Sequence, residues 1–495
     1  MRRMQPGRAK EGARKADCSE LMTTTLNRMA WGGIHDQLAG GFARYSVDRR
    51  WLIPHFEKML YDNALIPRNY LDAYVITGNG YWLEVARDCL DFVLRELTMP
   101  EGGFYCSLDA DSEGVEGKYY VWTPEQISEV LGKEDAAFFC DVFDVSVRGN
   151  FEHGNSALNF PEGPEACMKR LKLSDAEFWK RVNPLKAKLL ESREKRIRPG
   201  RDDKMLTSWT SLMISAFVDG YKVIGDKKYL DAATKAASFI LDNLMKDGRL
   251  LRTYGRGISK LNAYLEDYAY FIQALLDLAS CDADYRWLCT AVKLNEQVLA
   301  HFWDSESIGF FFTSDDHEEL IARTKHFYDG STPSSSSVSV MNLIRLARLC
   351  NKPELLDKAA ATIRSYTPYF HKAPDQFSNM LCALDTYLSQ PIEVAVVYDS
   401  TCAEQARELI LEFYRCYIPS AVLAVVDLSL PDKDKLIDAC PLLRDRPIQG
   451  GKAALYICRN FTCEKPITDK DELKASLAKL LQSAVWERTQ AAAGE

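Results

Sequence analysis

The chain has 495 residues, which is enough for about three domains or for one large helical body with a smaller one. Hydrophobic residues make up 47% and charged residues 27%, a composition that supports a substantial core and excludes a disordered chain. The net charge of −8 argues against a nucleic-acid binder with a broad basic face. No run of about 18 apolar residues is present, so a membrane span is not expected.

The N-terminal segment, residues 1–19, is basic and is expected to be disordered. It lacks the apolar run of a secretory signal, which predicts a cytoplasmic protein with mitochondrial targeting as the alternative. The 14 cysteines show no CxxC pairs and predict reduced, mostly buried thiols. The pair Cys458 and Cys463 is likewise expected to be buried thiols rather than metal ligands.

Residues 20–390 repeat one unit, in which a helical segment is followed by a glycine turn, a short aromatic stretch and another helix. The turns lie at 40–46, 102–112, 247–255 and 308–316. A period of about 50 residues or more predicts an array of helical hairpins.

The helical segments are of two kinds that alternate along the chain. Segments that are apolar on every face are predicted to form an inner ring at 56–76, 208–224, 265–280, 334–350 and 375–389. Amphipathic segments are predicted to form an outer ring at 20–31, 82–97, 228–244, 286–302 and 353–370. The alternation predicts a mainly α fold, an (α/α)6 toroid. The order begins with an outer helix, so we expect a truncated protein whose toroid is incomplete at its N-terminus.

Two regions depart from the repeat. An insertion at about 113–206 is expected to contain a strand within 116–122, followed by a helix that Thr123 caps and Pro124 begins. Residues 391–495 alternate short β-branched runs with helices and predict a small C-terminal α/β subdomain. Within the array, Pro67 is expected to kink the helix at 56–76.

Polar side chains concentrate just before the inner helices. Inner helices of an alternating array run the same way, so their N-termini and positive dipole ends are expected to share one mouth. The predicted substrate-binding residues at this mouth are Asp36, Arg44, Tyr45, Trp51, Tyr61, Asp62, Lys204, Trp209, Tyr268, Asp329 and Ser334. The aromatic members suit stacking on sugar rings, although aromatic residues also simply pack.

The candidate catalytic residues are His55, Glu57, Asp202, Asp203, Glu266 and Asp267. His55 with Glu57 and Asp62 has the chemistry of an acid/base group and its orienting carboxylates. The alternative is a helix-start histidine that binds a backbone carbonyl. Asp202 and Asp203 are expected either to act in catalysis or to cap the helix at 208–224.

Four other charged residues have both a functional and a structural interpretation. Glu266 and Asp267 lie in an apolar stretch, where an unpaired charge is costly, so they either act or pair with Arg44 or Lys204. Asp36 and Arg44 flank a glycine-rich loop and either bind a ligand or brace the turn.

Metal and cofactor motifs are absent from the sequence. No HExxH, P-loop, GxSxG or zinc spacing occurs, so neither a metal nor a cofactor is expected. Asp109 and Asp111 have Asx-turn chemistry, with an oxygen-rich calcium site as the alternative. The serine run at 332–337 predicts a helix start whose hydroxyls face the mouth.

The segment GGIHDQLAGGFARYSVDRRWLIPHFEKMLYDNA at 32–64 resembles the signature of the spermatogenesis-associated protein 20 family. Further matches cover nearly the whole chain, at 102–127, 149–159, 202–209, 264–271, 329–338 and 455–469. The resemblance implies a thioredoxin-like domain joined to a six-hairpin glycosidase-type barrel, akin to N-acylglucosamine and cellobiose 2-epimerases. The thioredoxin-like domain with its cysteine motif would lie upstream, so no redox chemistry is expected of this chain.

The chain departs from the family pattern at two inner-helix starts. Thr210 and Ser211 stand where the family carries Asn-Gly, and Ser335 and Ser336 stand where it tends to carry an asparagine. Both changes remove an amide that could bind a ligand. The related epimerases use histidine pairs at positions where this chain has acidic residues, which disfavours epimerisation by that chemistry.

We therefore expect a carbohydrate-binding or carbohydrate-active barrel that serves carbohydrate metabolism, with carboxylate-based glycoside hydrolysis as its chemistry. The alternatives are a non-catalytic interaction module of a thioredoxin-like fusion family and a sugar epimerase or isomerase that uses His55. The expected partner is a small-molecule sugar, with a protein partner or self-association as the alternative.

Overall fold

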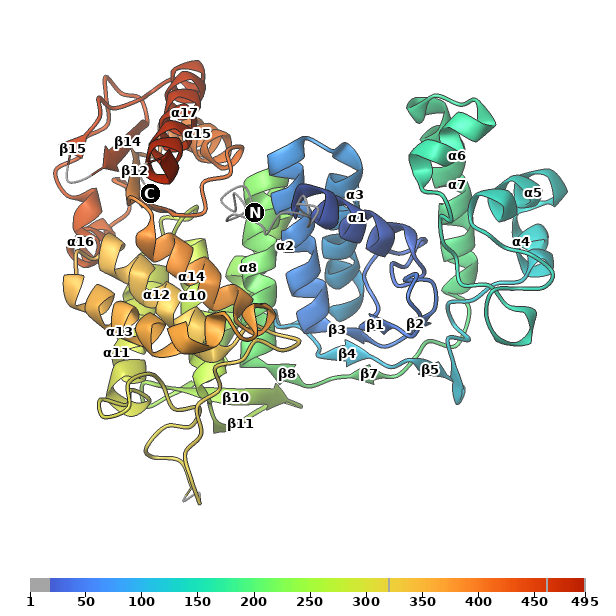
Figure 1. Ribbon diagram of the computed structural model, residues 1–495, viewed down its shortest axis with the longest axis horizontal. Coiled ribbons are helices and arrows are strands. Elements are labelled where there is room, and N and C mark those ends of the chain that lie inside the picture. Colours follow the sequence, from blue (N-terminus) through green and yellow to red (C-terminus); the bar gives the residue numbers. More distant parts are fainter. Residues whose placement is uncertain (1–17, 319–320, 460–461, 494–495) are drawn as a thin grey trace. The chain divides into compact units, whose positions relative to one another are not determined.

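The computed structural model describes residues 18–318, 321–459 and 462–493 (Figure 1). The expected disordered N-terminus falls almost entirely on residues 1–17, which lie outside the described residues. The chain divides into two units, each described by itself here. The first unit comprises Met1–Tyr70, Glu84–Thr98 and Tyr105–Asp203, and the second comprises Leu71–Leu83, Met99–Phe104 and Lys204–Glu495.

The helices expected in the array are present. They are α1 (Cys18–Trp31), α2 (Leu60–Thr77), α3 (Gly80–Phe92), α8 (Thr207–Ile224), α9 (Lys227–Asn243), α10 (Leu265–Leu278), α11 (Tyr285–His301), α12 (Ser335–Leu349), α13 (Pro353–Phe370) and α14 (Ser378–Leu388). A π-helical turn, Val93–Leu97, continues α3. Pro67 lies inside α2, which continues past it to Thr77, and the kink expected there stays a prediction.

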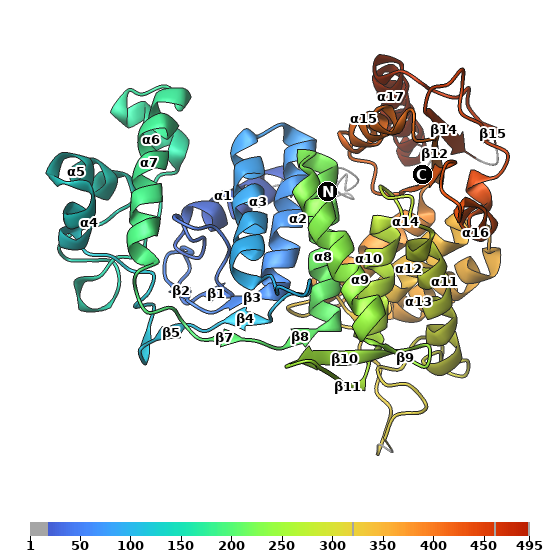
Figure 2. The same ribbon diagram turned by 180° about the vertical axis from the view of Figure 1, so that it is seen from behind.

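Helices α8 and α9 illustrate the two predicted kinds, and they pack side by side (Figure 2). Helix α8 buries residues on all its faces, whereas α9 buries a stripe that includes Tyr229, Ala233, Ala236 and Ile240. An apolar residue that leaves water contributes roughly 1.5–3 kcal/mol when its side chain is large. An all-round apolar helix is therefore stable only when other helices surround it.

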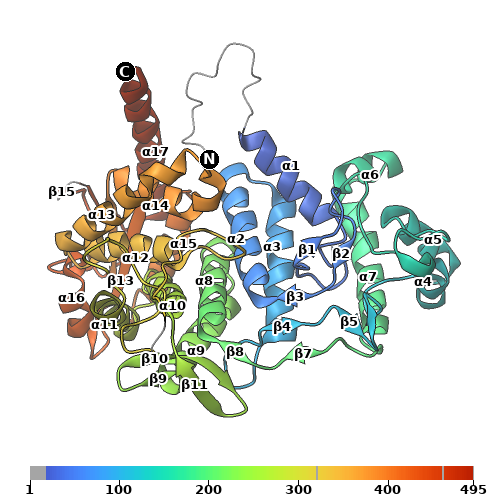
Figure 3. The ribbon, with the colours of Figure 1, turned by 60° about the horizontal axis from the view of Figure 1, so that its bottom comes forward.

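Within the second unit, the inner helices pack against one another in chain order, α8 on α10, α10 on α12 and α12 on α14 (Figure 3). The outer helices α9, α11 and α13 each pack on the inner helix that precedes them. The chain is mainly helical with the alternating hairpins of the (α/α)6 class, as predicted. Among the described residues, no helix is long and apolar enough to cross a membrane.

Short strands lie at the ends of the hairpins. In the first unit β3 (Lys58–Met59), β4 (Ser107–Leu108) and β7 (Arg201–Asp202) form one sheet, beside the pairs β1 (Tyr45–Ser46) with β2 (Pro54–His55) and β5 (Asp111–Ser112) with β6 (Val115–Glu116). In the second unit β10 (Arg249–Gly255) pairs with β8 (Met205–Leu206), β9 (Met245–Lys246) and β11 (Ile258–Asn262). Figure 2 shows β10 and β11 at one end of α8 and α9.

The insertion in the first unit has a core of its own. It contains α4 (Pro124–Leu131), α5 (Lys133–Val142), α6 (Pro164–Leu171) and α7 (Asp175–Arg193), whose buried aromatic residues cluster together. Thr123 caps α4 through a capping box and Pro124 begins it, as predicted. The strand expected within 116–122 is wrong, because the chain turns at Gly117 (φ 73°), where a Cβ would lie 2.5 Å from the Phe56 ring.

The C-terminal residues form the predicted α/β subdomain. Strand β12 (Ile392–Tyr398) pairs parallel with β13 (Ala421–Asp427) and antiparallel with β14 (Ala454–Arg459), which pairs with β15 (Thr462–Cys463). The accompanying helices are α15 (Ala403–Tyr414), α16 (Lys433–Ala439) and α17 (Lys470–Ala493).

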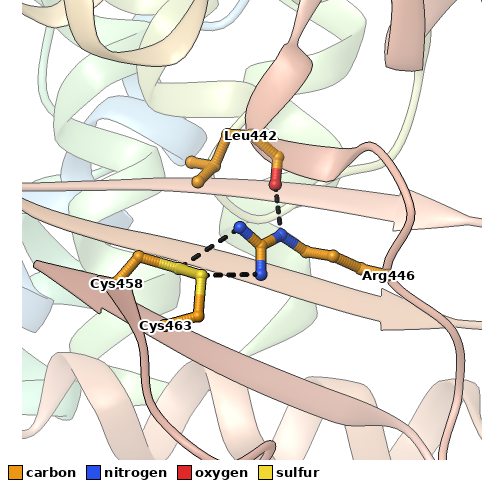
Figure 4. Close-up of a disulfide and its surroundings, with 4 residues drawn as sticks. All are labelled: Leu442, Arg446, Cys458 and Cys463. Carbon is orange, nitrogen blue, oxygen red and sulfur yellow. Dashed lines mark hydrogen bonds between the residues drawn. A yellow bond between two sulfur atoms is a disulfide. The ribbon is translucent and has the colours of Figure 1, made fainter. Parts of the chain in front are cut away.

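Cys458 and Cys463 are not the free thiols that the sequence predicts. They lie opposite each other on β14 and β15 and form a disulfide (Figure 4). The Arg446 guanidinium donates to both sulfurs, at 3.2 Å to Cys458 and 3.1 Å to Cys463. The local spacing CRNFTC did not reveal the disulfide, because only the antiparallel pairing places the two residues face to face.

Candidate functional site

Residues 54–59 supply side chains to two different clusters in the first unit. Phe56 and Lys58 are buried, whereas His55 and Glu57 are partly exposed. Extended backbone directs successive side chains to opposite sides, which explains this alternation. The exposed side chains join what we call the carboxyl cluster, and Lys58 joins what we call the Asp36 cluster.

The carboxyl cluster consists of Arg44, His55, Glu57, Tyr61 and Asp62. Arg44 Nη1 lies 3.4 Å from Glu57 Oε2, and His55 Nε2 lies 3.8 Å from the same oxygen. Arg44 also lies beside the Tyr61 hydroxyl, which raises the pKa of the guanidinium. Tyr61 and Asp62 belong to the first turn of α2, so the start of this inner helix is next to Glu57. The structure thus brings together five of the residues that the sequence nominated.

Asp62 is the carboxyl group with the most altered acidity in this cluster. Its Oδ2 is buried and has no hydrogen-bond partner among the described residues. Burial raises the pKa of Asp62 from 3.8 to about 7; the positive charge of Arg44 opposes this shift and the negative charge of Glu57 adds to it. At pH 7, therefore, about half of the Asp62 carboxyl groups hold a proton next to a second carboxyl group.

His55 has a partner that the sequence did not suggest. Its Nδ1 lies 2.8 Å from Glu116 Oε1, so neither a backbone carbonyl nor Asp62 orients the ring. Tyr45, whose surface is 47% exposed, stacks on His55 with ring centroids 5.0 Å apart. Glu116 follows His55 by 61 residues on the short strand β6, and no local pattern indicates the contact.

Replacing Asp62 with asparagine is expected to stabilise the protein at high pH. The folded pKa of Asp62, about 7, lies above the ordinary value, so the wild type loses stability as pH rises from about 4 to about 7. Asparagine has no charge to bury, and we expect the variant to be more stable by roughly 4 kcal/mol at pH 8 and nearly equal at pH 4. Denaturant unfolding at pH 4, 6 and 8 measures this. Asp203→Asn, at an exposed position, is the control, and a pH-independent difference for Asp62→Asn would contradict the argument.

The Asp36 cluster consists of Asp36, Lys58 and Arg193, whose side chains are 6%, 4% and 3% exposed. Arg193 donates to both carboxylate oxygens of Asp36 at 2.9 Å, and Lys58 Nζ lies 2.8 Å from Oδ2. Burial alone would raise the pKa of Asp36, but the charges and hydrogen bonds of Arg193 and Lys58 hold it well below its ordinary value. Asp36 thus braces its loop, because both of its carboxylate oxygens are already bound. The sequence analysis did not identify its partners Lys58 and Arg193.

The glycine-rich loop after Asp36 has a backbone that other residues would strain. Gly40 and Gly41 adopt φ of 72° and 78°. A Cβ on Gly40 would lie 2.2 Å from the Asp88 carbonyl oxygen. The tight loop lets Lys58 Nζ reach the Gly40 carbonyl oxygen at 3.1 Å as well as Asp36.

In the second unit, Glu266 and Asp267 pair with Arg252. Arg252 Nη1 lies 2.8 Å from Glu266 Oε1 and 3.2 Å from Asp267 Oδ2, so the expected pairing with Arg44 or Lys204 is not what is found. Asp267 also accepts from the backbone N–H of Ser208 (3.0 Å) and of Tyr264 (2.9 Å). Burial raises the pKa of Asp267 to about 6, against the opposing effect of Arg252. Its contacts are those of a residue that holds backbone in place.

The carboxylate at the start of α8 is therefore not the one expected. The residue before α8, Leu206, provides no side-chain cap, and Asp267 from α10 accepts from Ser208 in the first turn of α8 instead. Asp203 is 67% exposed and pairs with Arg201 at 2.7 Å, while Asp202 lies on β7. The expectation that Asp202 or Asp203 caps this helix is wrong.

Asp329, like Asp267, accepts hydrogen bonds from backbone N–H groups at the starts of two inner helices. Its Oδ1 accepts from the Ser334 N–H and its Oδ2 from the Asn379 N–H, each at 2.8 Å, at the starts of α12 and α14. Ser334 is the N-cap of α12, which confirms the predicted helix start. The four serines from Ser334 to Ser337 are buried, however, so their hydroxyls are not exposed as expected.

Four more of the predicted substrate-binding residues differ in how deeply they are buried. Tyr268 is fully buried, and its hydroxyl accepts from Arg249 Nε at 3.0 Å, the environment of a core residue. Lys204 is exposed, and Trp51 and Trp209 are half-buried.

Two clusters of acidic residues have the composition of a metal site, but their side chains are engaged in other contacts. The ligand atoms of His301, Asp315 and Asp316 lie within 4.8 Å of one another. His301 Nδ1 is already 2.7 Å from Asp315, and Asp316 is ion-paired with Arg249. Asp109 accepts from the Asp111 N–H at 3.3 Å, which confirms the Asx turn.

Comparison with known proteins places the chain among named relatives. No family model matches it. Spermatogenesis-associated protein 20 of Homo sapiens is 31% identical over 493 residues, which cover 92% of this chain and 62% of that protein. The protein of the same name from Rattus norvegicus gives the same values. A protein of Caenorhabditis elegans is 30% identical, with 94% of this chain and 67% of that protein covered. The chain thus spans 62% of the length of the human and rat relatives.

Several solved structures resemble the chain at low sequence identity. Cellobiose 2-epimerase from Bacillus thermoamylovorans B4167 is 11% identical with a TM-score of 0.42, covering 75% of this chain and 70% of that one. A D-mannose isomerase is 13% identical with a TM-score of 0.36, covering 72% and 87%. Because these TM-scores are below 0.5, the likeness by itself assigns no reaction.

Proposed function

The chain belongs to the spermatogenesis-associated protein 20 family, and we propose that this part of the family's sequence binds and processes a carbohydrate at the carboxyl cluster. The observation that carries the proposal is the state of Asp62, a carboxyl with a buried oxygen that lacks a partner among the described residues and a pKa of about 7. Glycoside hydrolysis needs one carboxyl that is protonated near neutral pH and a second that is ionised.

The neighbours of Asp62 suit the remaining parts of such a reaction. Asp62 would give its proton to the glycosidic oxygen as the bond to the sugar breaks, and the Glu57 carboxylate would position the water that adds to the sugar carbon. Arg44 pairs with Glu57, so a cation lies beside this carboxylate. Tyr45, exposed and stacked on His55, offers an aromatic face to a sugar ring.

A second candidate function is a non-catalytic carbohydrate-binding or interaction module. It is favoured by the contacts of Asp267 and Asp329, whose oxygens are already bound by backbone N–H groups at inner-helix starts. An epimerase that uses His55 would need a proton path past Glu57 and Glu116, both of which lie beside the ring.

A sugar screen of the wild type against two variants separates these functions. We expect a mono- or disaccharide, at 100 times its Kd, to stabilise the wild type by about 2.7 kcal/mol in thermal unfolding. Asp62→Asn should keep this binding but lower turnover of the bound disaccharide at least 100-fold, because it removes the acid. Glu57→Gln should lower turnover as well, whereas the control Glu162→Gln, at a surface pair with Arg170, should not.

Three outcomes decide among the candidates. Binding without release of reducing sugar by the wild type would favour the non-catalytic module. Conversion of the sugar to its epimer, seen by NMR and abolished by His55→Gln, would favour the epimerase. Failure of every sugar to alter the melting temperature would overturn the carbohydrate proposal.

A further inference from the structure

A cavity of about 230 Å³ lies in the first unit, next to the Asp36 cluster. Its lining includes two tyrosines, Phe92 and an excess of cations. The charged residues that line it are Lys58, Arg193, Arg198, Arg201, Asp36 and Glu96. Four positive side chains thus face two carboxylates.

Arg198 and Arg201 also pair with Glu194 and Asp203, which lie outside the lining, but the buried cations Lys58 and Arg193 are not fully neutralised. Asp36 is shared between Lys58 and Arg193, so the three buried side chains keep one positive charge in excess. Glu96 is shared in the same way between Arg198 and Arg95. Uncompensated charge is costly to bury, and an anion in the cavity would offset that cost.

Two buried hydrogen-bond donors that line this cavity lack a partner among the described residues. Arg193 Nε and the Tyr120 hydroxyl are buried and have no hydrogen-bond partner among the described residues. Burial raises the pKa of Tyr120, so its hydroxyl keeps its proton and remains a donor. Both residues line the cavity, and the Arg193 guanidinium lies 5.4 Å from the centre of the Tyr120 ring.

We propose that this cavity binds the phosphate group of a small metabolite. The positive charge left on the buried trio Asp36, Lys58 and Arg193 suits an anionic phosphate group, and guanidinium groups fit phosphate oxygens with paired hydrogen bonds. The rings of Tyr119, Tyr120 and Phe92 supply apolar walls for the organic part of the ligand. The carboxyl cluster contributes no residue to this lining, so the two proposals stand or fall separately.

Inorganic phosphate is the probe, titrated calorimetrically into the full chain at constant ionic strength. We expect Arg198→Gln to weaken phosphate binding roughly tenfold, because it removes a charged donor while Glu96 keeps Arg95 as its partner. Arg201→Gln is a second variant, at an exposed position that pairs with Asp203, and should act in the same direction. Arg87→Gln is the matched control, since Arg87 also pairs with a glutamate but does not line the cavity.

Malonate, added at the same concentration, tests the chemistry of the anion. Phosphate binding that both cavity variants weaken and malonate fails to reproduce would support the proposal. Equal binding of malonate would overturn the assignment to phosphate. No phosphate binding by the wild type, or binding that Arg87→Gln weakens as much as Arg198→Gln does, would overturn the site itself.

Discussion

Replacing Asp36 with alanine is expected to lower the free energy of unfolding by about 3–5 kcal/mol at pH 7. The substitution leaves Lys58 and Arg193 buried, at 4% and 3% exposure, without the carboxylate that both contact. It also removes the acceptor of the Leu38 and Ala39 N–H groups in the glycine-rich loop. Urea unfolding followed by circular dichroism measures the loss.

Two further variants test whether charge is the cause. Combining Asp36→Leu with Lys58→Met and Arg193→Met should recover most of the stability, because it removes the buried cations together with their partner. Asp141→Ala, at an exposed pair with Arg170, should change stability by less than about 0.5 kcal/mol. A loss below about 1 kcal/mol for Asp36→Ala would contradict the role of the cluster.

The pH dependence of the Asp36 contribution has a defined sign. The folded pKa of Asp36 is held well below its ordinary value, so its contribution is complete above that ordinary value. The contribution is lost as pH falls through the folded pKa. The difference between wild type and Asp36→Ala should therefore be constant from pH 5 to 8 and shrink in more acidic solution.

Replacing Asp267 with alanine is expected to destabilise the second unit by about 2–4 kcal/mol, through the starts of two helices at once. The N–H groups of Ser208 and Tyr264 lose their acceptor, and a buried donor without a partner costs about 1–3 kcal/mol. Asp267→Asn keeps one acceptor oxygen and should cost less. Hydrogen exchange at the first turns of α8 and α10 would show whether the loss begins there.

A neighbouring carboxylate provides the control for Asp267. Glu266 contacts the same Arg252 but accepts from no backbone N–H group that the structure records, so Glu266→Gln should cost less than about 1 kcal/mol. Equal losses for the two positions would assign the effect to the ion pair with Arg252 rather than to the helix starts.

Periodicity along the chain was sufficient to predict the hairpin array. The apolar segment at 208–224 and the striped segment at 228–244 correspond to α8 (Thr207–Ile224) and α9 (Lys227–Asn243), because the burial of a helix depends on its own 3.6-residue pattern. Capping followed local rules equally well at Thr123, whose partner Gln126 is three residues away.

The same local rules failed where partners are distant in sequence. Asp202 and Asp203 lie close before α8, yet the carboxylate that binds its first turn is Asp267, 59 residues after Ser208. Arg193 follows its partner Asp36 by 157 residues. A single sequence contains no signal for such pairs, since they depend on how hairpins and the insertion pack.

The extended segment 54–59 places His55 and Glu57 on one side and Lys58 on the other, and this alternation limits how the length of the preceding loop can vary. Deleting one residue between Gly41 and His55 would shift this segment by one position and exchange its two faces. Glu57 would then be forced inward beside Asp36, and Lys58 would turn outward to water. Point substitutions in this stretch should therefore be tolerated far better than any change in the number of its residues.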